Sequence, residues 1–150
     1  MPFRNIDRNS VLDWLIDYSD WAEQSDGPSY EYCFFEDVVL HGENLRGYVL
    51  KYINFSNADL SGVDLRGVDL TRATLKGVNL LAAKLSETCL KNADLRNADL
   101  RDADFRLAKL HNADLRNAKI DGADFSFSYL IGADLQGVYK LNANFYKTRF

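Results

Sequence analysis

The sequence is poor in the residues that mark several protein classes. It contains only 2 prolines, 2 cysteines, 2 histidines and 1 methionine among 150 residues. Two cysteines do not build a disulfide framework, and so few prolines exclude a collagen-like or proline-rich chain. Lysine and arginine number 18 against 22 aspartates and glutamates, which leaves no general basic surplus for binding nucleic acid.

Long apolar segments are also missing. No run approaches the roughly 18 apolar residues of a membrane span. The opening seven residues are polar and lack the apolar core of a signal peptide. At the same time 47% of the residues are hydrophobic, which is too many for a disordered chain. We therefore expect a soluble cytoplasmic protein with neither a nucleic acid nor a membrane as its partner.

Most of the sequence is occupied by a repeat of five residues. From Phe55 to Phe150, 19 of the 20 residues whose numbers are divisible by five are apolar, and Lys140 is the exception. We call this position i. Alanine or valine occupies 16 of the 20 positions i−2, aspartate or asparagine is frequent at i−1, and eight of the nine glycines lie at i+2.

Neither a helix nor a flat strand explains this period. On a helix, a step of five residues turns the chain by about 500°, so the leucines would point in every direction. On a flat strand, successive leucines would alternate between two faces. The period fits a chain that bends once per repeat and points the side chains of i−2 and i inward. Glycine and asparagine suit the bend, because these two residues tolerate a positive φ angle. Repeated bends of one hand close into coils, and stacked coils form a β-solenoid.

Segments such as 93–101, ADLRNADLR, resemble the pentapeptide-repeat protein family, whose pattern is roughly A(D/N)LXX. The resemblance covers residues 53–150 closely and 33–52 loosely. It implies an all-β solenoid, a right-handed quadrilateral parallel β-helix with four pentapeptides per coil, and hence about five to six coils in residues 31–150. It also implies a bacterial protein.

The residues themselves give one indication of four sides. A phenylalanine occupies position i at every twentieth residue near the C-terminal end, and these rings would stack in one column of a four-sided coil. They are Phe105, Phe125 and Phe145.

Residues 1–30 break the period and are interpreted as a capping segment. Helical spacing of apolar residues after a serine N-cap predicts a helix over about 11–24. Its apolar face carries Trp14 and Trp21, while acidic residues such as Asp17 occupy the other face. We expect the tryptophan face to cover the first coil, since an open end would expose core and strand edges. The alternative is a helix that docks a partner.

Catalytic and metal-binding motifs are not recognisable. His41 and His111 lie 70 residues apart at outward positions and would emerge on opposite faces. Cys33 falls at an inward position and Cys89 at an outward one, without metal-ligand spacing. Nucleotide-binding and nucleophile motifs are absent from the sequence. We predict a non-enzymatic protein with no cofactor and no bound metal.

Five repeats place an aspartate before the inward residue and an arginine after it. Both charges then project from the same side of the coil, which predicts mixed-charge ladders rather than a catalytic pair of carboxylates. A column of Lys76, Arg96 and Arg116 is a weak candidate for contact with an acidic partner, because aspartates flank it. The five pairs are Asp64 and Arg66, Asp94 and Arg96, Asp99 and Arg101, Asp104 and Arg106, and Asp114 and Arg116.

The leading functional hypothesis is a protein–protein interaction or scaffold module with an unidentified protein partner. Large apolar side chains occupy outward positions near the C-terminal end, and such clusters mark contact surfaces. No cap comparable to the N-terminal helix follows the last repeat, so we also expect a homodimer through the C-terminal coil. The candidate partner-binding residues are Leu107, Phe127, Tyr129, Ile131, Tyr139, Leu141 and Tyr146.

The resemblance also implies an alternative function, because some members of the family bind type II topoisomerases by imitating duplex DNA with an acidic rod. Such proteins protect or inhibit gyrase. Residues 53–150 carry 14 lysines and arginines against 12 aspartates and glutamates, a net charge of +2. DNA carries one negative charge per about 1.7 Å of axis. The near-neutral rod favours the interaction module over a DNA mimic.

Overall fold

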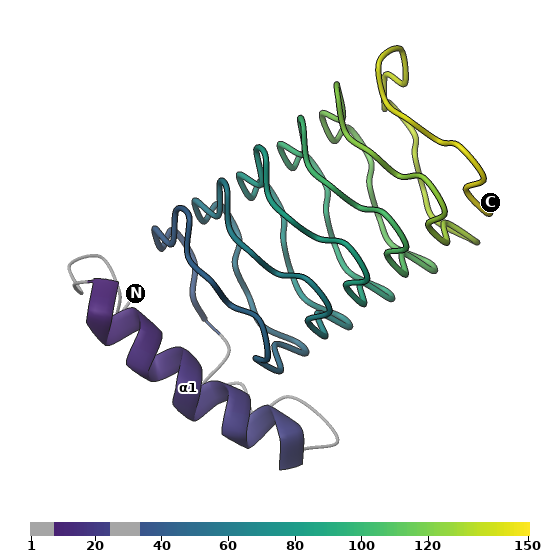
Figure 1. Ribbon diagram of the computed structural model, residues 1–150. Helices are drawn as coiled ribbons and strands as arrows, with labels where there is room; N and C mark the ends of the chain where they lie inside the picture. The colour runs from purple at the N-terminus through teal and green to yellow at the C-terminus, as the bar shows by residue number, and fades with distance from the viewer. Residues whose placement is uncertain (1–7, 25–33) are drawn as a thin grey trace.

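The computed structural model describes residues 8–24 and 34–150, which form one α-helix and a coiled rod (Figure 1). Helix α1 (Arg8–Gln24) lies across one end of the rod, and the C-terminus lies at the other end. Within these two ranges no helix is both long enough and apolar enough to cross a membrane.

Each coil of the rod takes 20 residues, so it has four sides of one pentapeptide each. Isolated parallel bridges pair a residue at i−1 with the residue 20 positions later, from Phe34 with Asn54 to Tyr129 with Arg149. Residues 34–150 therefore make just under six coils, in agreement with the expected five to six. At about 4.8 Å per coil the rod is roughly 25–30 Å long. The four-sided β-helix predicted from the sequence is confirmed.

The corners are β-turns with a left-handed residue at i+2. The N–H of i+3 donates to the carbonyl of i, as Ala58 does to Phe55 at 3.0 Å. The φ angle at i+2 is positive in 22 of the 23 corners between residues 37 and 147, as in a type II turn. Only eight of those 22 residues are glycine; five of the others are asparagine and two are aspartate, which tolerate this region, and the remaining seven bear about 1–2 kcal/mol of left-handed strain each.

The aspartate or asparagine at i−1 supports the corner that follows it. Its Oδ1 accepts the backbone N–H of i+1, as Asp64 Oδ1 does from Arg66 at 3.2 Å. A neutral repeat does the same, since Asn54 Oδ1 accepts the N–H of Ser56 at 3.0 Å. The short acidic or amide side chain at i−1 is thus explained by the local turn.

The inward positions i and i−2 form a continuous core along the rod. From Phe35 to Leu130, every side chain at position i is at most 1% exposed. The predicted phenylalanine column is confirmed: Phe125 stacks on Phe105 and Phe145 with centroid distances of 4.7 and 5.2 Å and 5° between the ring planes. Polar residues at i−2 bind core carbonyls, as Thr88 does.

The last coil departs from this regularity around Lys140. Within the described coils, Tyr139 takes no part in the bridge series, and Asn142 is the one corner residue without a positive φ. The Lys140 ammonium group lies 5.9 Å from the centre of the Phe145 ring and 5.7 Å from that of Phe150. Lys140 is exposed in this distorted coil, and its cation lies over aromatic faces at the C-terminal end of the rod rather than in the core.

Helix α1 packs on the first coil through one buried face. The Tyr18 hydroxyl donates to the Lys51 carbonyl, and the Val49 N–H donates to Ser19 Oγ at 2.8 Å. We expected Trp14 to lie against the coil, but it is 47% exposed. The buried face of α1 is narrower than the predicted apolar face, and Trp14 lies beside it. The helix also begins at Arg8, three residues before the predicted start. The buried residues are Val11, Leu15, Tyr18, Ser19 and Ala22.

Two neighbouring phenylalanines provide a test of the core. Phe125→Ala removes a fully buried ring from the stacked column and is expected to lower the free energy of unfolding by about 3–5 kcal/mol. Phe127→Ala, in the same coil, removes an exposed ring and should change it by less than about 1 kcal/mol. Urea denaturation followed by circular dichroism measures both, and equal losses would contradict the assignment of inward and outward positions.

Candidate interaction surface

The seven residues predicted to contact a partner all lie outside the fully buried core. Six are exposed and Tyr129 is partly buried. The exposed fractions are 46% for Leu107, 43% for Phe127, 48% for Ile131, 81% for Tyr139, 89% for Leu141 and 59% for Tyr146.

Five of the seven residues lie on one corner of the coil and the side that adjoins it, and the other two lie on another face. Leu107 and Phe127 occupy the same corner in successive coils, and Phe127 meets the Tyr146 ring edge-on at a centroid distance of 5.6 Å. Tyr129 and Ile131 flank the inward residue of the adjoining side. We call these five residues the corner patch.

Tyr139 and Leu141 lie elsewhere on the rod. They flank Lys140, two pentapeptides after the side that carries Tyr129, and in a four-sided coil this is the opposite side. Their spacing of ten residues from Tyr129 already implies this placement in a four-sided coil, so the seven residues should not have been grouped as one surface from the sequence.

Cations are interleaved with the aromatic rings of the corner patch. The Lys147 ammonium group lies 5.6 Å from the centre of the Phe127 ring and 5.1 Å from that of Tyr146. The Arg149 guanidinium lies 5.1 Å from the centre of the Tyr129 ring. The patch therefore combines apolar area with positive charge held over aromatic faces.

Two members of the patch occupy strained backbone. Leu107 and Phe127 have φ of 60° and 59°, and the same corner in earlier coils is occupied by Gly47, Gly67 and Glu87. A bulky side chain at a left-handed corner costs about 1–2 kcal/mol relative to glycine. Because both side chains are also exposed, packing into the core does not explain their presence.

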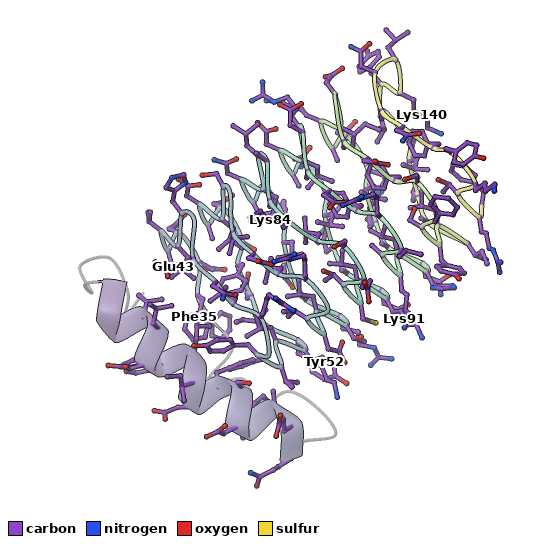
Figure 2. All side chains as sticks on the ribbon, in the orientation of Figure 1. Phe35, Glu43, Tyr52, Lys84, Lys91 and Lys140 are labelled. Atoms are coloured by element: carbon purple, nitrogen blue, oxygen red, sulfur yellow. The ribbon has the colours of Figure 1, made fainter. Side chains whose placement is uncertain are left out.

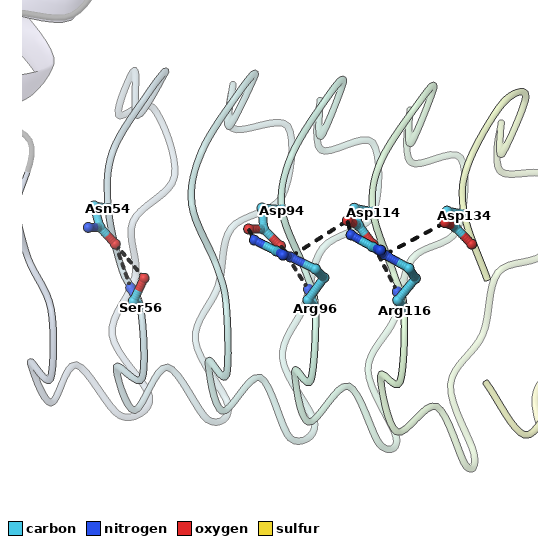
Figure 3. A network of polar contacts seen from close by, with 7 residues as sticks. All are labelled: Asn54, Ser56, Asp94, Arg96, Asp114, Arg116 and Asp134. Carbon is cyan, nitrogen blue, oxygen red and sulfur yellow. Dashed lines mark hydrogen bonds and ion pairs between the residues drawn. The ribbon is translucent and has the colours of Figure 1, made fainter. Parts of the chain in front are cut away.

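A mixed-charge ladder runs along another side of the rod (Figure 3). Arg116 donates from Nε to Asp114 Oδ1 at 2.9 Å and from a terminal nitrogen to Asp114 Oδ2 at 2.6 Å. Its Nε lies 3.6 Å from Asp134 of the next coil, and Arg96 likewise joins Asp94 to Asp114. All five predicted Asp–Arg pairs are confirmed. Arg96 and Arg116 of the predicted basic column are thus neutralised by their own neighbours.

The paired aspartates are held in their ionised form. The hydrogen bonds from Arg116 hold the pKa of Asp114 below its ordinary value, although partial burial opposes the shift. Arg106 lowers the pKa of Asp104 in the same way. A carboxylate kept ionised by a fixed cation is a poor proton donor or acceptor near neutral pH.

Among the described residues, the two histidines and Cys89 do not converge on a site. His41 Nδ1 lies 2.8 Å from Ser61 Oγ, and His111, two sides away in the coil, stacks on Tyr129. Cys89 Sγ lies 3.3 Å from a threonine hydroxyl, and Cys33 falls outside the described residues. In residues 8–24 and 34–150, no three His, Cys, Asp or Glu side chains are grouped so as to hold a metal ion.

One feature of the surface was not predicted: a cavity of about 390 Å³ between α1 and the first coil. It is lined by Trp14, Asp17, Tyr18, Trp21 and Phe35. The spacing of the three aromatic residues on the helix was visible in the sequence. We expected Asp17 on the opposite face, and nothing in the sequence indicated that the helix leaves a space beside the coil.

The geometry defines the class of the protein as a quadrilateral β-helix with a helix packed over one end. A family model described as pentapeptide repeat region matches residues 49–125, just over half of the chain. The chain belongs to the pentapeptide-repeat family, whose fold is the right-handed quadrilateral β-helix.

Several solved structures resemble the chain. The pentapeptide repeat protein Rfr23 from the cyanobacterium Cyanothece 51142 is 29% identical with a TM-score of 0.62, covering 75% of this chain and 88% of its own. The pentapeptide repeat protein alr5209 from Nostoc Pcc 7120 is 32% identical, with a TM-score of 0.43, covering 67% and 80%. A trypsin-treated variant of QnrB1, a plasmid-mediated fluoroquinolone resistance protein, is 15% identical, with a TM-score of 0.39, covering 73% and 78%. No curated protein sequence matched the chain.

The ladder predicts how stability responds to acid. Because the folded pKa of Asp114 is lowered, its pairing stabilises the protein above the unfolded pKa near 3.8 and is lost as pH falls through the folded value. Arg116→Gln should lower stability slightly at pH 7 and reduce the further loss on acidification from about pH 5 to pH 3. Urea midpoints across this range measure the effect.

Arg72→Gln is the matched control, since Arg72 lies 6.0 Å from the centre of the Tyr52 ring rather than on an aspartate. If both variants lose stability on acidification as steeply as the parent chain, the ladder does not contribute to acid sensitivity.

Proposed function

We propose that the chain is a non-enzymatic protein–protein interaction module and that the corner patch is its contact surface. The observation that carries the proposal is the placement of Leu107 and Phe127, two large apolar side chains that are exposed and sit on strained left-handed corners. Fourteen corner residues other than glycine share this backbone conformation, so what distinguishes these two is a large apolar side chain that is left exposed there.

The composition of the patch defines the chemistry of the partner. Aromatic and aliphatic side chains at the patch supply area that is buried on contact, and aromatic residues are enriched among those that dominate binding energy. Lys147 and Arg149 lie over the rings and favour carboxylates opposite them. The partner is therefore a protein segment that combines apolar side chains with aspartate or glutamate.

The rod presents this patch as a rigid platform. Each coil is bonded to the next through its backbone, as where Phe127 N–H donates to the Tyr146 carbonyl at 2.9 Å. The rings therefore sit on backbone that loses little conformational freedom on binding, which favours affinity.

The topoisomerase-binding alternative requires a rod that presents unpaired negative charge. In the ladder, by contrast, arginine nitrogens lie 2.6 Å from the carboxylate oxygens of Asp94 and Asp114. These pairs weaken the field that an imitation of DNA needs. The alternative is tested directly by adding the purified chain to a gyrase supercoiling reaction, where inhibition or protection at low micromolar concentration would support it.

A double variant, Leu107→Gly with Phe127→Gly, tests the proposed surface. Glycine removes both side chains and relieves both strained corners, so the rod should stay folded while partner binding falls by at least tenfold. The measurement is affinity capture from an extract of the native host on the immobilised chain, followed by titration of the captured protein.

Ala82→Gly is the control, because Ala82 is also a left-handed corner residue, with φ of 54°, and lies on a different corner column of the rod. It should bind like the parent chain. A partner retained equally by the double variant and the parent would rule out the corner patch as its contact surface.

We also propose that two chains associate through the C-terminal coil. Phe150 is 63% exposed and Phe145 is only partly buried, so stacking two such ends would cover aromatic area. Light scattering at high micromolar concentration should give a dimer mass that falls on Phe150→Asp, while the control Asp121→Asn, an exposed change on another coil, leaves it unchanged. A monomer mass for the parent chain would contradict the proposal.

A further inference from the structure

One of the four sides of the rod has a different charge from the others. It consists of residues 48–52, 68–72, 88–92, 108–112, 128–132 and 148–150. Its side chains include five lysines and arginines against one aspartate, a net charge of +4. The other three sides of residues 34–150 together carry 11 lysines and arginines against 14 aspartates and glutamates, a net charge of −3. The near neutrality of the whole rod therefore conceals one basic side.

Four of the five cations on this side are exposed and unpaired. Lys51 lies 3.8 Å from Asp69, the one acidic residue of the side. Within residues 8–24 and 34–150, none of the other four takes part in an ion pair, and Figure 2 shows Lys91 projecting outward from the rod. We call these four residues the basic strip: Arg72, Lys91, Lys109 and Arg149.

Support of the corners does not explain the composition of this side. On the adjoining side that carries Asp104 and Arg106, five of the six residues at i−1 are aspartate or asparagine. On the side of the basic strip only Asp69 is, and its Oδ1 accepts the Thr71 N–H at 2.9 Å. The next four coils lack a carboxylate or amide at i−1, so their corners lose this acceptor. The residues there are Cys89, Lys109, Tyr129 and Arg149.

The length of the basic strip fits an extended chain laid along the rod. Arg72 and Arg149 are four coils apart, or about 19 Å at about 4.8 Å per coil. An extended segment covers this distance with about six residues and presents every second side chain to the rod. Clustered cations attract anions, but each exposed contact with a carboxylate is weak by itself. A partner must therefore present several carboxylates in a row.

A single-stranded nucleic acid fits the strip less well. Proteins that bind such strands combine cations with open aromatic faces on which bases stack. Here His111 of the preceding coil stacks on the Tyr129 ring with 5.7 Å between the ring centres, and Arg149 of the following coil lies 5.1 Å from the centre of that ring. The Tyr52 ring likewise lies under Arg72. Cations therefore occupy ring faces that bases would need.

A membrane surface also fits less well. Proteins that lie on a bilayer bury apolar side chains among the lipids in addition to pairing cations with the headgroups. In residues 68–72, 88–92 and 108–112, all of which the structure describes, no large apolar side chain is exposed. The middle of the strip thus offers charge without apolar area, which suits carboxylates on a hydrated protein segment.

We propose that the basic strip binds an acidic protein segment, which lies extended along the rod axis with its carboxylates opposite the four cations. The strip adjoins the corner patch, because Tyr129 and Ile131 lie on the same side of the coil. The inference rests on the proposed role as an interaction module but not on the corner patch, since the strip and the patch share no residue. It also differs from the column of Arg96 and Arg116, which their own aspartates neutralise.

A synthetic peptide of eight residues, in which glutamate alternates with serine, is the probe. Labelled with fluorescein, it should give a saturable rise in fluorescence anisotropy with the full chain at about 50 mM sodium chloride. The same peptide with glutamine in place of glutamate should bind at least tenfold more weakly, because it keeps the length and loses the charge. Raising the salt to about 300 mM should weaken the glutamate peptide at least fivefold.

Two double variants locate the binding surface. Lys91→Gln with Lys109→Gln removes the two central cations of the strip and should weaken the glutamate peptide at least fivefold. Lys84→Gln with Lys119→Gln is the matched control, because both lysines are exposed at i−1 on other sides of the rod and the net charge changes equally. The control should weaken binding by less than twofold. Circular dichroism checks that both variants are folded.

The proposal is overturned if the glutamate and glutamine peptides bind equally or if the two double variants behave alike. It is also overturned if a thymidine oligonucleotide of equal charge binds more tightly than the peptide, or if the chain sediments with phosphatidylserine vesicles at about 150 mM salt. Leu107→Gly with Phe127→Gly leaves the strip intact and should bind the peptide like the parent chain. A captured partner that does not need the corner patch therefore contradicts the proposed contact surface alone, whereas failure of the peptide tests contradicts the strip alone.

Discussion

The left-handed corner at i+2 is the constraint on which the rest of this structure depends. It turns the chain after every fifth residue, so that positions i−2 and i always return to the inside. Four such corners close a coil, and the backbone of each coil then bonds to the next. The leucine column, the phenylalanine stack and the charge ladder all follow from that single repeated turn, because residues 20 apart are forced into register.

The same constraint separates structural from functional positions. From Ile53 to Leu130, inward positions hold apolar or small side chains, and where a polar one occurs, as at Thr88, its hydroxyl is bonded to a core carbonyl. Outward positions are free to vary from coil to coil, so the rod is a scaffold whose columns carry different surfaces. The aspartate–arginine ladder gives one column a surface of balanced charge. Leu107 and Phe127 give another column an apolar surface, and both residues lie on left-handed backbone.

The sequence predicted what the period controls and missed what it does not. Four sides, the inward column and the Asp–Arg pairs follow from the spacing of residues such as Phe105, Phe125 and Phe145, because a fixed period fixes the register. The exposure of Trp14, by contrast, depends on how α1 rests on the first coil. Such packing between a repeat and a non-repeating segment has no periodic signal.

The stability of the Leu107→Gly, Phe127→Gly double variant tests most directly whether these two residues serve contact rather than folding. Each substitution relieves about 1–2 kcal/mol of left-handed strain in the folded state. It also stabilises the unfolded chain by about 0.4–1 kcal/mol, because glycine raises the conformational entropy of that chain. The free energy of unfolding should therefore be unchanged or slightly higher than that of the parent chain. A loss of more than about 2 kcal/mol would show that the two side chains hold the rod together, and would contradict the assignment of the corner patch to partner binding.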